Sequence, residues 1–167
     1  GGEIGRLLMA TNPRWAAPAA PDPTQRAIWD EGTLAERSSW LRALRRTDPV
    51  TARELLVDGF GQESATTRAE LLAVLGEGLS AADQDVALAA VGDRSRAVVE
   101  VALDLLARLP ESPLRRDMRL LAGRHLSVRR RLLGPVVTVT PIAAAEFAPW
   151  PVPSGDPWTT VLGRVDP

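Results

Sequence analysis

Three segments of the chain share one helical pattern, and the spacing of these segments constrains the fold more than any other feature. They begin at Arg37, Arg68 and Arg96, so the pattern recurs at intervals of roughly 30 residues. Such a period is typical of stacked helix pairs, in which each pair needs its neighbours to cover its apolar stripe. The pattern predicts an array of helical hairpins. Bulky apolar residues follow each arginine by three and seven positions: Trp40 and Leu44, Leu71 and Leu75, Val99 and Leu103.

Start and stop signals divide the chain into individual helices. Thr33 and Glu36 have the spacing of a capping box, and Ser80 and Asp83 repeat it. Asp48-Pro49 ends one helix and begins the next, because Asp is a good N-cap and Pro fits the first helical position. The predicted helices are approximately 3–11, 23–30, 34–46, 49–60, 64–76, 81–91, 96–109 and 113–126.

The character of the chain changes after Gly134-Pro135. Residues 136–140, VVTVT, are the only strand candidate, and five prolines lie between positions 141 and 157. The predicted fold is therefore all-α: HEAT-like hairpins stacked as a short α-solenoid, with a Pro/Trp-rich tail that contains at most one short strand. A non-repetitive helical bundle remains the alternative. The predicted divisions are an N-terminal helix and Pro-rich linker (1–22), a helical-repeat domain (23–134), and a tail leading into further sequence (135–167).

The residue inventory leaves few routes to catalysis. The chain has no Cys, no Lys and one histidine, His125, so disulfides, thiolate zinc sites, thiol nucleophiles and a phosphate loop with its lysine are excluded. Asp83 and Asp85 are interpreted as acids stabilised at a helix N-terminus. We expect no catalytic residue, no metal and no cofactor. His125 is predicted to be a packed, hydrogen-bonded residue on a helical stripe with Leu114, Met118, Leu121, Val128 and Leu132.

Two resemblances follow from quoted stretches. Residues 93–109, DRSRAVVEVALDLLARL, are similar to a HEAT-repeat unit, with Asp93 in the turn and Val98, Ala102 and Leu106 on the buried face. Val99 departs from that pattern, because such repeats usually have Arg there. Five further stretches resemble an uncharacterised family of bacterial HEAT-like proteins, frequent in actinobacteria. They are NPRW (12–15), WDEGTLAER (29–37), LRALRRTDP with ARELL (41–56), RAELLAVL with GLSAAD (68–83) and DRS with ALDLLARLPES (93–112).

That longer resemblance covers about Gly5 to Leu133 and implies a fold and partners, without catalytic residues. Members of the family are larger than this chain, and are encoded near MoxR-type AAA ATPases, von Willebrand A-domain proteins and SWIM zinc-finger proteins. The resemblance therefore implies a protein partner, with the ATPase or the von Willebrand A-domain protein as candidates.

Charge is distributed unevenly, although the net charge is only −1. Residues 113–134 hold seven arginines and one aspartate. This segment is the candidate interaction surface, either for a partner protein or for nucleic-acid phosphates. Its arginines are Arg115, Arg116, Arg119, Arg124, Arg129, Arg130 and Arg131.

The preferred hypothesis is a non-enzymatic helical-repeat scaffold that binds another protein. The alternatives are a nucleic-acid-binding repeat that uses residues 113–131, and a piece of a larger protein whose active site lies outside this chain. No run of 18 apolar residues exists to span a membrane, and the lack of Cys favours the cytoplasm. Trp15, Trp29 and Trp40 are expected to be buried, and Trp150 and Trp158 to contact further sequence.

Overall fold

The computed structural model describes residues 23–131 and 134–151, and this part of the chain is mostly helical with one two-stranded sheet. The N-terminal helix predicted for 3–11, the linker, Trp15 and Trp158 lie outside the described residues. Short 3-10 turns, η2 to η5, join or follow the helices at 60–62, 74–76, 81–83 and 144–147. The elements are α2 (Pro23–Glu31), α3 (Leu34–Thr47), α4 (Pro49–Gly59), α5 (Ala65–Ala73), α6 (Gln84–Ala90), α7 (Arg96–Arg108), α8 (Pro113–His125), β1 (Leu126–Arg131) and β2 (Gly134–Val139).

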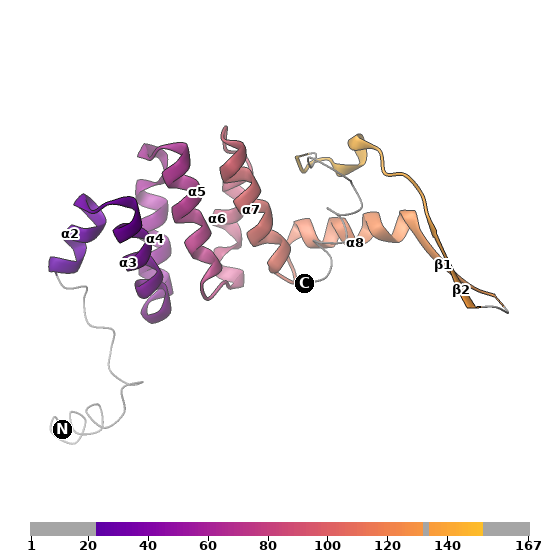
Figure 1. The fold of residues 1–167 in the computed structure, drawn as a ribbon, viewed down its shortest axis with the longest axis horizontal. Coiled ribbons are helices and arrows are strands. Elements are labelled where there is room, and N and C mark those ends of the chain that lie inside the picture. Colours follow the sequence, from indigo (N-terminus) through magenta and orange to yellow (C-terminus); the bar gives the residue numbers. More distant parts are fainter. Residues whose placement is uncertain (1–22, 132–133, 152–167) are drawn as a thin grey trace, which may run out of the picture.

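Helices α3 to α7 follow one another along the long axis of the molecule in sequence order (Figure 1). In that view α3, α5 and α7 form the nearer row, and α4 and α6 lie behind them. Contacts join α3 to α4 and α5, and join α7 to both α5 and α6. The core between the rows is aliphatic, and its completely buried members include Leu41, Leu56, Leu72, Leu75, Val98 and Leu106.

The predicted helix caps are confirmed. The side chains of Thr33 and Glu36 form a reciprocal capping box at the start of α3. Asp48 accepts a hydrogen bond from the N–H of Thr51, with Pro49 at the first position of α4. Gly32 fits the end of α2 because a Cβ atom there would clash with the carbonyl oxygen of Ile28. These local signals set where each helix begins.

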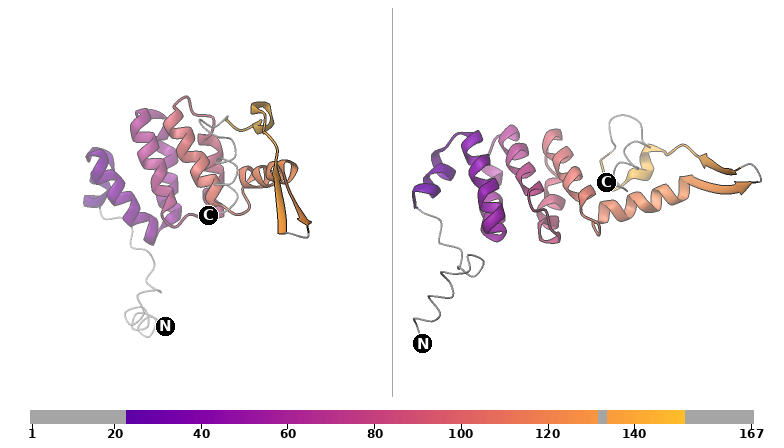
Figure 2. Two further views of the ribbon diagram at one scale, coloured as in Figure 1. Left: turned by 45° about the vertical axis from the view of Figure 1, so that its right-hand side comes forward. Right: turned by 60° about the horizontal axis from the view of Figure 1, so that its bottom comes forward.

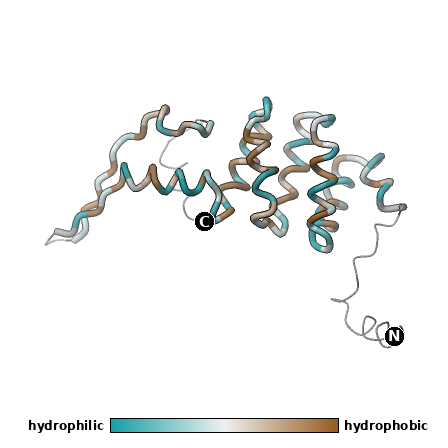
Figure 3. Tube along the Cα trace, turned by 180° about the vertical axis from the view of Figure 1, so that it is seen from behind, coloured by the Kyte–Doolittle hydropathy of each residue, from teal (hydrophilic) through white to brown (hydrophobic). Residues whose placement is uncertain are grey.

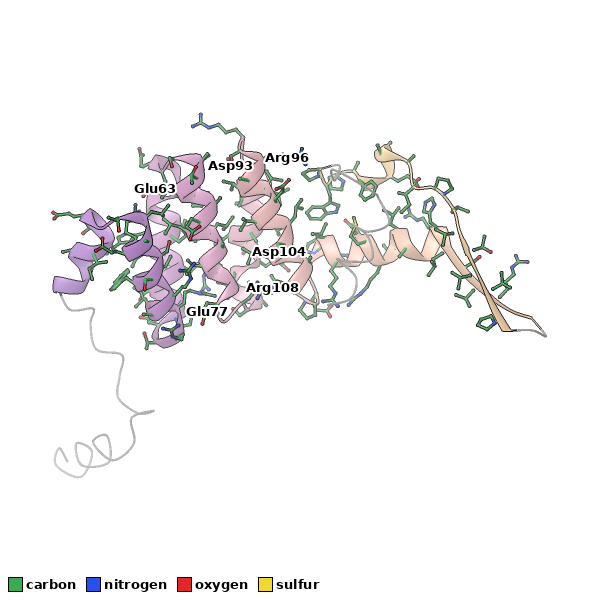
Figure 4. All side chains as sticks on the ribbon, in the orientation of Figure 1. Glu63, Glu77, Asp93, Arg96, Asp104 and Arg108 are labelled. Atoms are coloured by element: carbon green, nitrogen blue, oxygen red, sulfur yellow. The ribbon has the colours of Figure 1, made fainter. Side chains whose placement is uncertain are left out.

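The aligned arginines Arg37 and Arg68 make equivalent contacts to the next part of the chain. Arg37 binds Glu63, which precedes α5, and Arg68 binds Asp93, which precedes α7. Arg68 donates from Nε and Nη2 to both carboxylate oxygens of Asp93, each at 2.9 Å. Glu63 and Asp93 lie at the same end of the helical array in Figure 4.

Each of these two arginines also lies over an aromatic ring that precedes its own helix. The Arg37 guanidinium is 4.8 Å from the ring centroid of Trp29, and that of Arg68 is 5.9 Å from Phe60. Trp29 and Phe60 have the same separation in the sequence as the two arginines. An aromatic ring, an arginine and a carboxylate therefore recur as one unit, which we call the aromatic–arginine–carboxylate motif.

A second buried arginine, Arg45, binds several segments at the opposite end of α3. Its guanidinium donates to both oxygens of Asp83 at 2.9 Å. It also donates to four backbone carbonyl oxygens, those of Pro49, Leu75, Glu77 and Gly78. Three of these carbonyls belong to Leu75 in η3 and to the loop that follows it, so Arg45 gives these backbone acceptors a donor from another helix.

Asp83 has a larger structural role than that of the N-terminal acid predicted from the sequence. It is completely buried and also binds Arg53 and the backbone N–H of Ser80. Burial alone raises the pKa of Asp83, but the hydrogen bonds from Arg45, Ser80 and Arg53 outweigh it and lower the pKa below its ordinary value. The carboxylate stays ionised inside the protein because two guanidinium groups surround it.

Helix α8 does not pair alongside α7 as the hairpin pattern predicts. It runs outward along the long axis and continues directly into the β-hairpin (Figure 2). Its apolar residues Leu114, Met118 and Leu121 share the buried core with residues of the segment that returns from the hairpin, among them Phe147 and Trp150. The returning segment therefore covers the stripe that a following helix covers in a regular repeat.

The strand predicted at 136–140 is found as β2, but the prediction that it is the only strand candidate is wrong. Residues 126–131 form β1, which pairs antiparallel with β2, with Leu126 opposite Val139 and Arg131 opposite Gly134. The helical stripe predicted to extend through Val128 and Leu132 accordingly ends at His125. The physical reason is the Val- and Thr-rich segment 134–139, which offers a strand partner that helical periodicity does not detect.

Candidate interaction surfaces

The arginines of segment 113–131 do not form a single surface. Arg116, Arg119 and Arg124 are exposed on α8, and Arg129 is exposed on β1. Arg130 and Arg131 belong to β1, but their side chains lie outside the described residues. The prediction that Arg115 belongs to this surface is corrected below.

Arg115 is buried, with only 8% of the residue exposed. It lies one position after the buried Leu114 in the first turn of α8, and its Nε atom has no hydrogen-bond partner in the described structure. The sequence offered Arg115 and Arg119 as one face because they are four positions apart. Burial of the first turn against the rest of the core separates them, so Arg115 contributes packing instead of an accessible charge.

The exposed side of α8 forms a coherent basic patch, which we call the α8 arginine face. Arg116, Leu120 and Arg124 follow one another at intervals of four, and Arg119 lies beside them. Leu120 is 57% exposed, which is high for a large apolar residue. In the described part of the chain, no carboxylate forms an ion pair with these three arginines. The face therefore offers three charges without direct ion-pair partners around one apolar side chain.

The segment that returns from the hairpin covers the other side of α8. Trp150 is buried and donates a hydrogen bond from Nε1 to the Asp117 carboxylate at 3.0 Å. Trp150 thus contacts α8, whereas the sequence favoured a contact with further sequence. Trp29 is buried as predicted, and Trp40 is partly buried beside it with ring centroids 5.9 Å apart.

His125 is a packed, hydrogen-bonded residue, which confirms the prediction for its environment. Its Nδ1 atom lies 3.0 Å from the Thr140 hydroxyl, and its Nε2 atom lies 2.7 Å from the Glu146 carboxylate. The pKa of Glu146 is lowered below its ordinary value, mainly by the hydrogen bond from the N–H of Ala143 and to a smaller extent by the one from His125. These contacts fasten the returning segment to the end of α8.

The β-hairpin carries an apolar face that has no partner among the described residues. Leu126 lies opposite Val139, and Val128 lies opposite Val137, so all four side chains share one face. Val128, Val137 and Val139 are each at least 50% exposed. The hairpin projects away from the helices, and Figure 3 shows that hydrophobic residues continue along it.

A groove between α4 and α6 is a second candidate surface, and it is acidic. Glu54 and Asp58 of α4 and Asp85 of α6 line it, with Val57 and Val86 between them. No cation among the described residues forms an ion pair with these three carboxylates. Val57 is 53% exposed. We call this feature the α4–α6 groove.

The α4–α6 groove was not predicted from the sequence. Glu54 and Asp58 are four positions apart, which places them on one helix face, but the same spacing occurs on many solvated helices. Asp85 was assigned only to a helix N-terminus. These carboxylates come together because α4 and α6 lie side by side, although the whole of α5 separates the two helices in the sequence. No local sequence signal encodes that placement.

Neither a metal-binding group nor a membrane-spanning helix is found among the described residues. In residues 23–131 and 134–151, no group of three or more His, Asp or Glu side chains is arranged to hold a metal ion. Among the helices of this same part, none has the length and apolar character needed to cross a bilayer.

Comparison with curated proteins and with solved structures yields no match. A family model does match, over residues 1–150, and it describes a family of unknown function, DUF5691. The match includes every described helix and both strands, and it confirms the prediction of an uncharacterised family. Bacterial origin, HEAT-like repeats and gene neighbours stay predictions from the resemblance. Because the match spans most of the chain, the protein belongs to the DUF5691 family of unknown function.

Proposed function

We propose that this chain is a non-enzymatic, HEAT-like helical-repeat module that binds another protein through the α8 arginine face. The observation that carries the proposal is the set of three exposed arginines without ion-pair partners, among the described residues, around the exposed Leu120. Arg is enriched at protein interfaces and at their binding hot spots. The partner surface is acidic with an apolar centre.

One recurring feature supports the repeat architecture. The aromatic–arginine–carboxylate motif occurs twice, with a constant spacing between its aromatic rings and its arginines, and it joins each unit to the next. Contacts between neighbouring units dominate in helical-repeat proteins, whose surfaces commonly serve binding. His125, the only histidine, is engaged with Thr140 and Glu146, which supports a structural role for it.

The resemblance to HEAT-like proteins supplies the candidate partners. These are a MoxR-type AAA ATPase and a von Willebrand A-domain protein. The proposed compartment is the cytoplasm, which the lack of Cys favours.

A nucleic acid is the second candidate ligand, because Arg116, Arg119, Arg124 and Arg129 continue from the helix into the strand. Phosphate contacts release counterions, so the affinity for a duplex would fall steeply as the salt concentration rises. Base stacking by a single strand would need exposed aromatic rings. Among the described tryptophans, Trp29 and Trp150 are buried and Trp40 is partly buried. The protein partner is therefore preferred.

The proposal is tested by affinity capture from a nuclease-treated lysate of the native host, with this chain as bait. A triple variant, Arg116→Ala/Arg119→Ala/Arg124→Ala, is compared with a control, Arg42→Ala/Arg46→Ala/Arg108→Ala, which removes two exposed arginines and one half-buried arginine from α3 and α7. The captured protein is then purified, and its affinity for each variant is measured by calorimetry.

The expected result is an acidic-surfaced protein retained by the wild type and the control and bound at least about tenfold more weakly by the triple variant. Retention of an ATPase or a von Willebrand A-domain protein would identify the partner. Equal binding to the triple variant would refute the role of the α8 arginine face. Capture of nucleic acid alone, in samples without nuclease, would favour the second candidate.

A further inference from the structure

Two surfaces of this chain are complementary in charge, and each has an apolar centre. The α4–α6 groove presents three carboxylates without ion-pair partners, among the described residues, around Val57 and Val86. The α8 arginine face presents three arginines in the same condition around Leu120. Opposite potentials around matching apolar centres are the arrangement that specific protein interfaces use.

The groove keeps a negative charge when its arginines are included. Arg26 and Arg53 also line it, but Arg26 binds Asp30, and Arg53 binds the buried Asp83. The count then includes Arg45, which also binds Asp83. The three arginines are Arg26, Arg45 and Arg53, and the five carboxylates are those of Asp30, Glu54, Asp58, Asp83 and Asp85, so the net charge is −2. The groove therefore selects a cationic occupant.

The shape of the occupant follows from the groove. Its two walls are helices, and a third helix can lie between two others when its side chains fill the space between their ridges. The α8 arginine face belongs to a helix of 13 residues. Its charges at Arg116, Arg119 and Arg124 extend over about two turns, and Glu54 and Asp58 with Val57 cover about one turn of the groove wall.

The two surfaces belong to different ends of the same molecule. In Figure 1 and Figure 2, α5 to α7 separate α4 from the outward-running α8. The returning segment holds α8 through the Trp150–Asp117 and His125–Glu146 contacts. The α8 arginine face is therefore held apart from the groove of its own copy, and the complementary contact is one between copies.

We propose that the α4–α6 groove binds the α8 arginine face of a second copy of this chain. Such a contact joins different surfaces of the two copies, so it leaves one groove and one α8 free and extends head to tail. The same α8 face carries the proposed function, so a partner protein and a second copy would compete for it. The self-association itself does not depend on that partner.

The test is sedimentation equilibrium of the purified chain over a range of concentrations, at about 0.05 M and about 0.5 M salt. At low salt, the average mass is expected to rise with concentration from the monomer value of 17.9 kDa. At high salt, it is expected to stay near that value at the same concentrations, because exposed charges are then screened.

Charge-reversal variants locate the contact. Glu54→Arg/Asp58→Arg changes the groove, and Arg116→Glu/Arg124→Glu changes the helix; each alone is expected to weaken association at least about tenfold. An equimolar mixture of the two variants is expected to associate again, because the unchanged α8 face of the groove variant meets the unchanged groove of the helix variant. Glu70→Arg/Asp104→Arg, on the exposed surface of α5 and α7, is the matched control and should associate as the wild type does.

A chain that stays at 17.9 kDa at every concentration and salt would overturn the inference. So would self-association that the groove variant leaves unchanged, or a mixture that fails to recover it while circular dichroism shows both variants folded. The two proposals can fail independently. Binding of the partner protein is measured by affinity capture and calorimetry, whereas self-association is measured by sedimentation equilibrium.

Discussion

Arg45 and Asp83 show how a single buried pair can hold several segments together. The guanidinium binds the carboxylate and the carbonyl oxygens that follow α5, and the carboxylate also binds Arg53 and Ser80. A buried ion pair on its own is weak evidence of stability, because both charges lose their hydration. Here the carbonyl contacts make the arginine hard to replace.

Asp83→Asn is expected to lower the free energy of unfolding by about 3–5 kcal/mol, because it leaves two guanidinium groups facing a neutral side chain. The neighbouring exposed change Asp85→Asn should alter it by no more than about 0.5 kcal/mol. Urea unfolding followed by circular dichroism measures both. Equal stability of the two variants would show that Asp83 does not organise this cluster.

Replacing both partners with apolar residues, as in Arg45→Met/Asp83→Leu, is expected to remain destabilising by several kcal/mol. In a simple buried pair, such a replacement is often neutral, but here it leaves the carbonyl oxygens of Leu75, Glu77 and Gly78 without their donor. The same unfolding assay decides the point. A double variant as stable as the wild type would mean that those carbonyl contacts contribute nothing.

Acid should weaken the fold through the paired carboxylates. Hydrogen bonds from Arg68 hold the pKa of Asp93 below its ordinary value, as those from Arg45 help to do for Asp83. A depressed pKa in the folded state contributes stability that is present above the unfolded pKa of about 4 and is lost as the pH falls toward the folded pKa. The free energy of unfolding, measured in urea, should therefore decline below about pH 4, and less steeply for Asp93→Asn. An unchanged slope in that variant would contradict this account.

At the scale of elements, the sequence predicts the helices well and the end of the array poorly. Thr33, Asp48 and Ser80 mark helix starts because a cap acts within three positions. The β-hairpin escapes prediction because the helical stripe of α8 runs on into Val128, and only pairing with β2 decides that segment. Arg115 fails for the same reason, since a neighbouring element buries it.

The segment that returns from the hairpin should behave as a local unit held by Phe147. Phe147→Ala removes a side chain that is 1% exposed, and a buried Phe typically contributes about 3–5 kcal/mol. Amide hydrogen exchange in residues 142–151 is expected to accelerate strongly, while α3 to α7 stay protected. Val137→Ala, at an exposed position of the hairpin, serves as the control. Equal loss of protection throughout the chain would show that the segment and the helices unfold as one unit.

For the whole molecule, the recurrence of Arg37 and Arg68 was visible in the sequence, but the contacts that these arginines make were not. Arg37 and Arg68 were aligned by their positions, and their acceptors Glu63 and Asp93 are separated by nearly the same interval. Searching for acids at the same period would have paired them. The α4–α6 groove could not be found this way, because it depends on how two helices lie beside each other in space.

The repeat architecture proposed above requires consecutive helix pairs to be equivalent units joined by the aromatic–arginine–carboxylate motif. The most direct test removes one unit, residues 34–64, so that Thr33 is followed by Ala65. Arg68 then takes the place of Arg37 beside Trp29, and Thr33 takes the capping position of Ser64.

Residues 34–64 include Arg45 and Arg53, so each shortened chain also carries Asp83→Asn, which avoids an unpaired buried carboxylate. If the units are equivalent, the chain that lacks residues 34–64 should remain helical by circular dichroism and unfold cooperatively at a lower stability than the wild type, because each unit contacts only its neighbours. A variant lacking residues 34–68, which loses Arg68 as well, should be markedly less stable. Collapse of the chain that lacks only residues 34–64 to an unfolded or molten state would contradict the account, since it would show that the helices form one indivisible bundle.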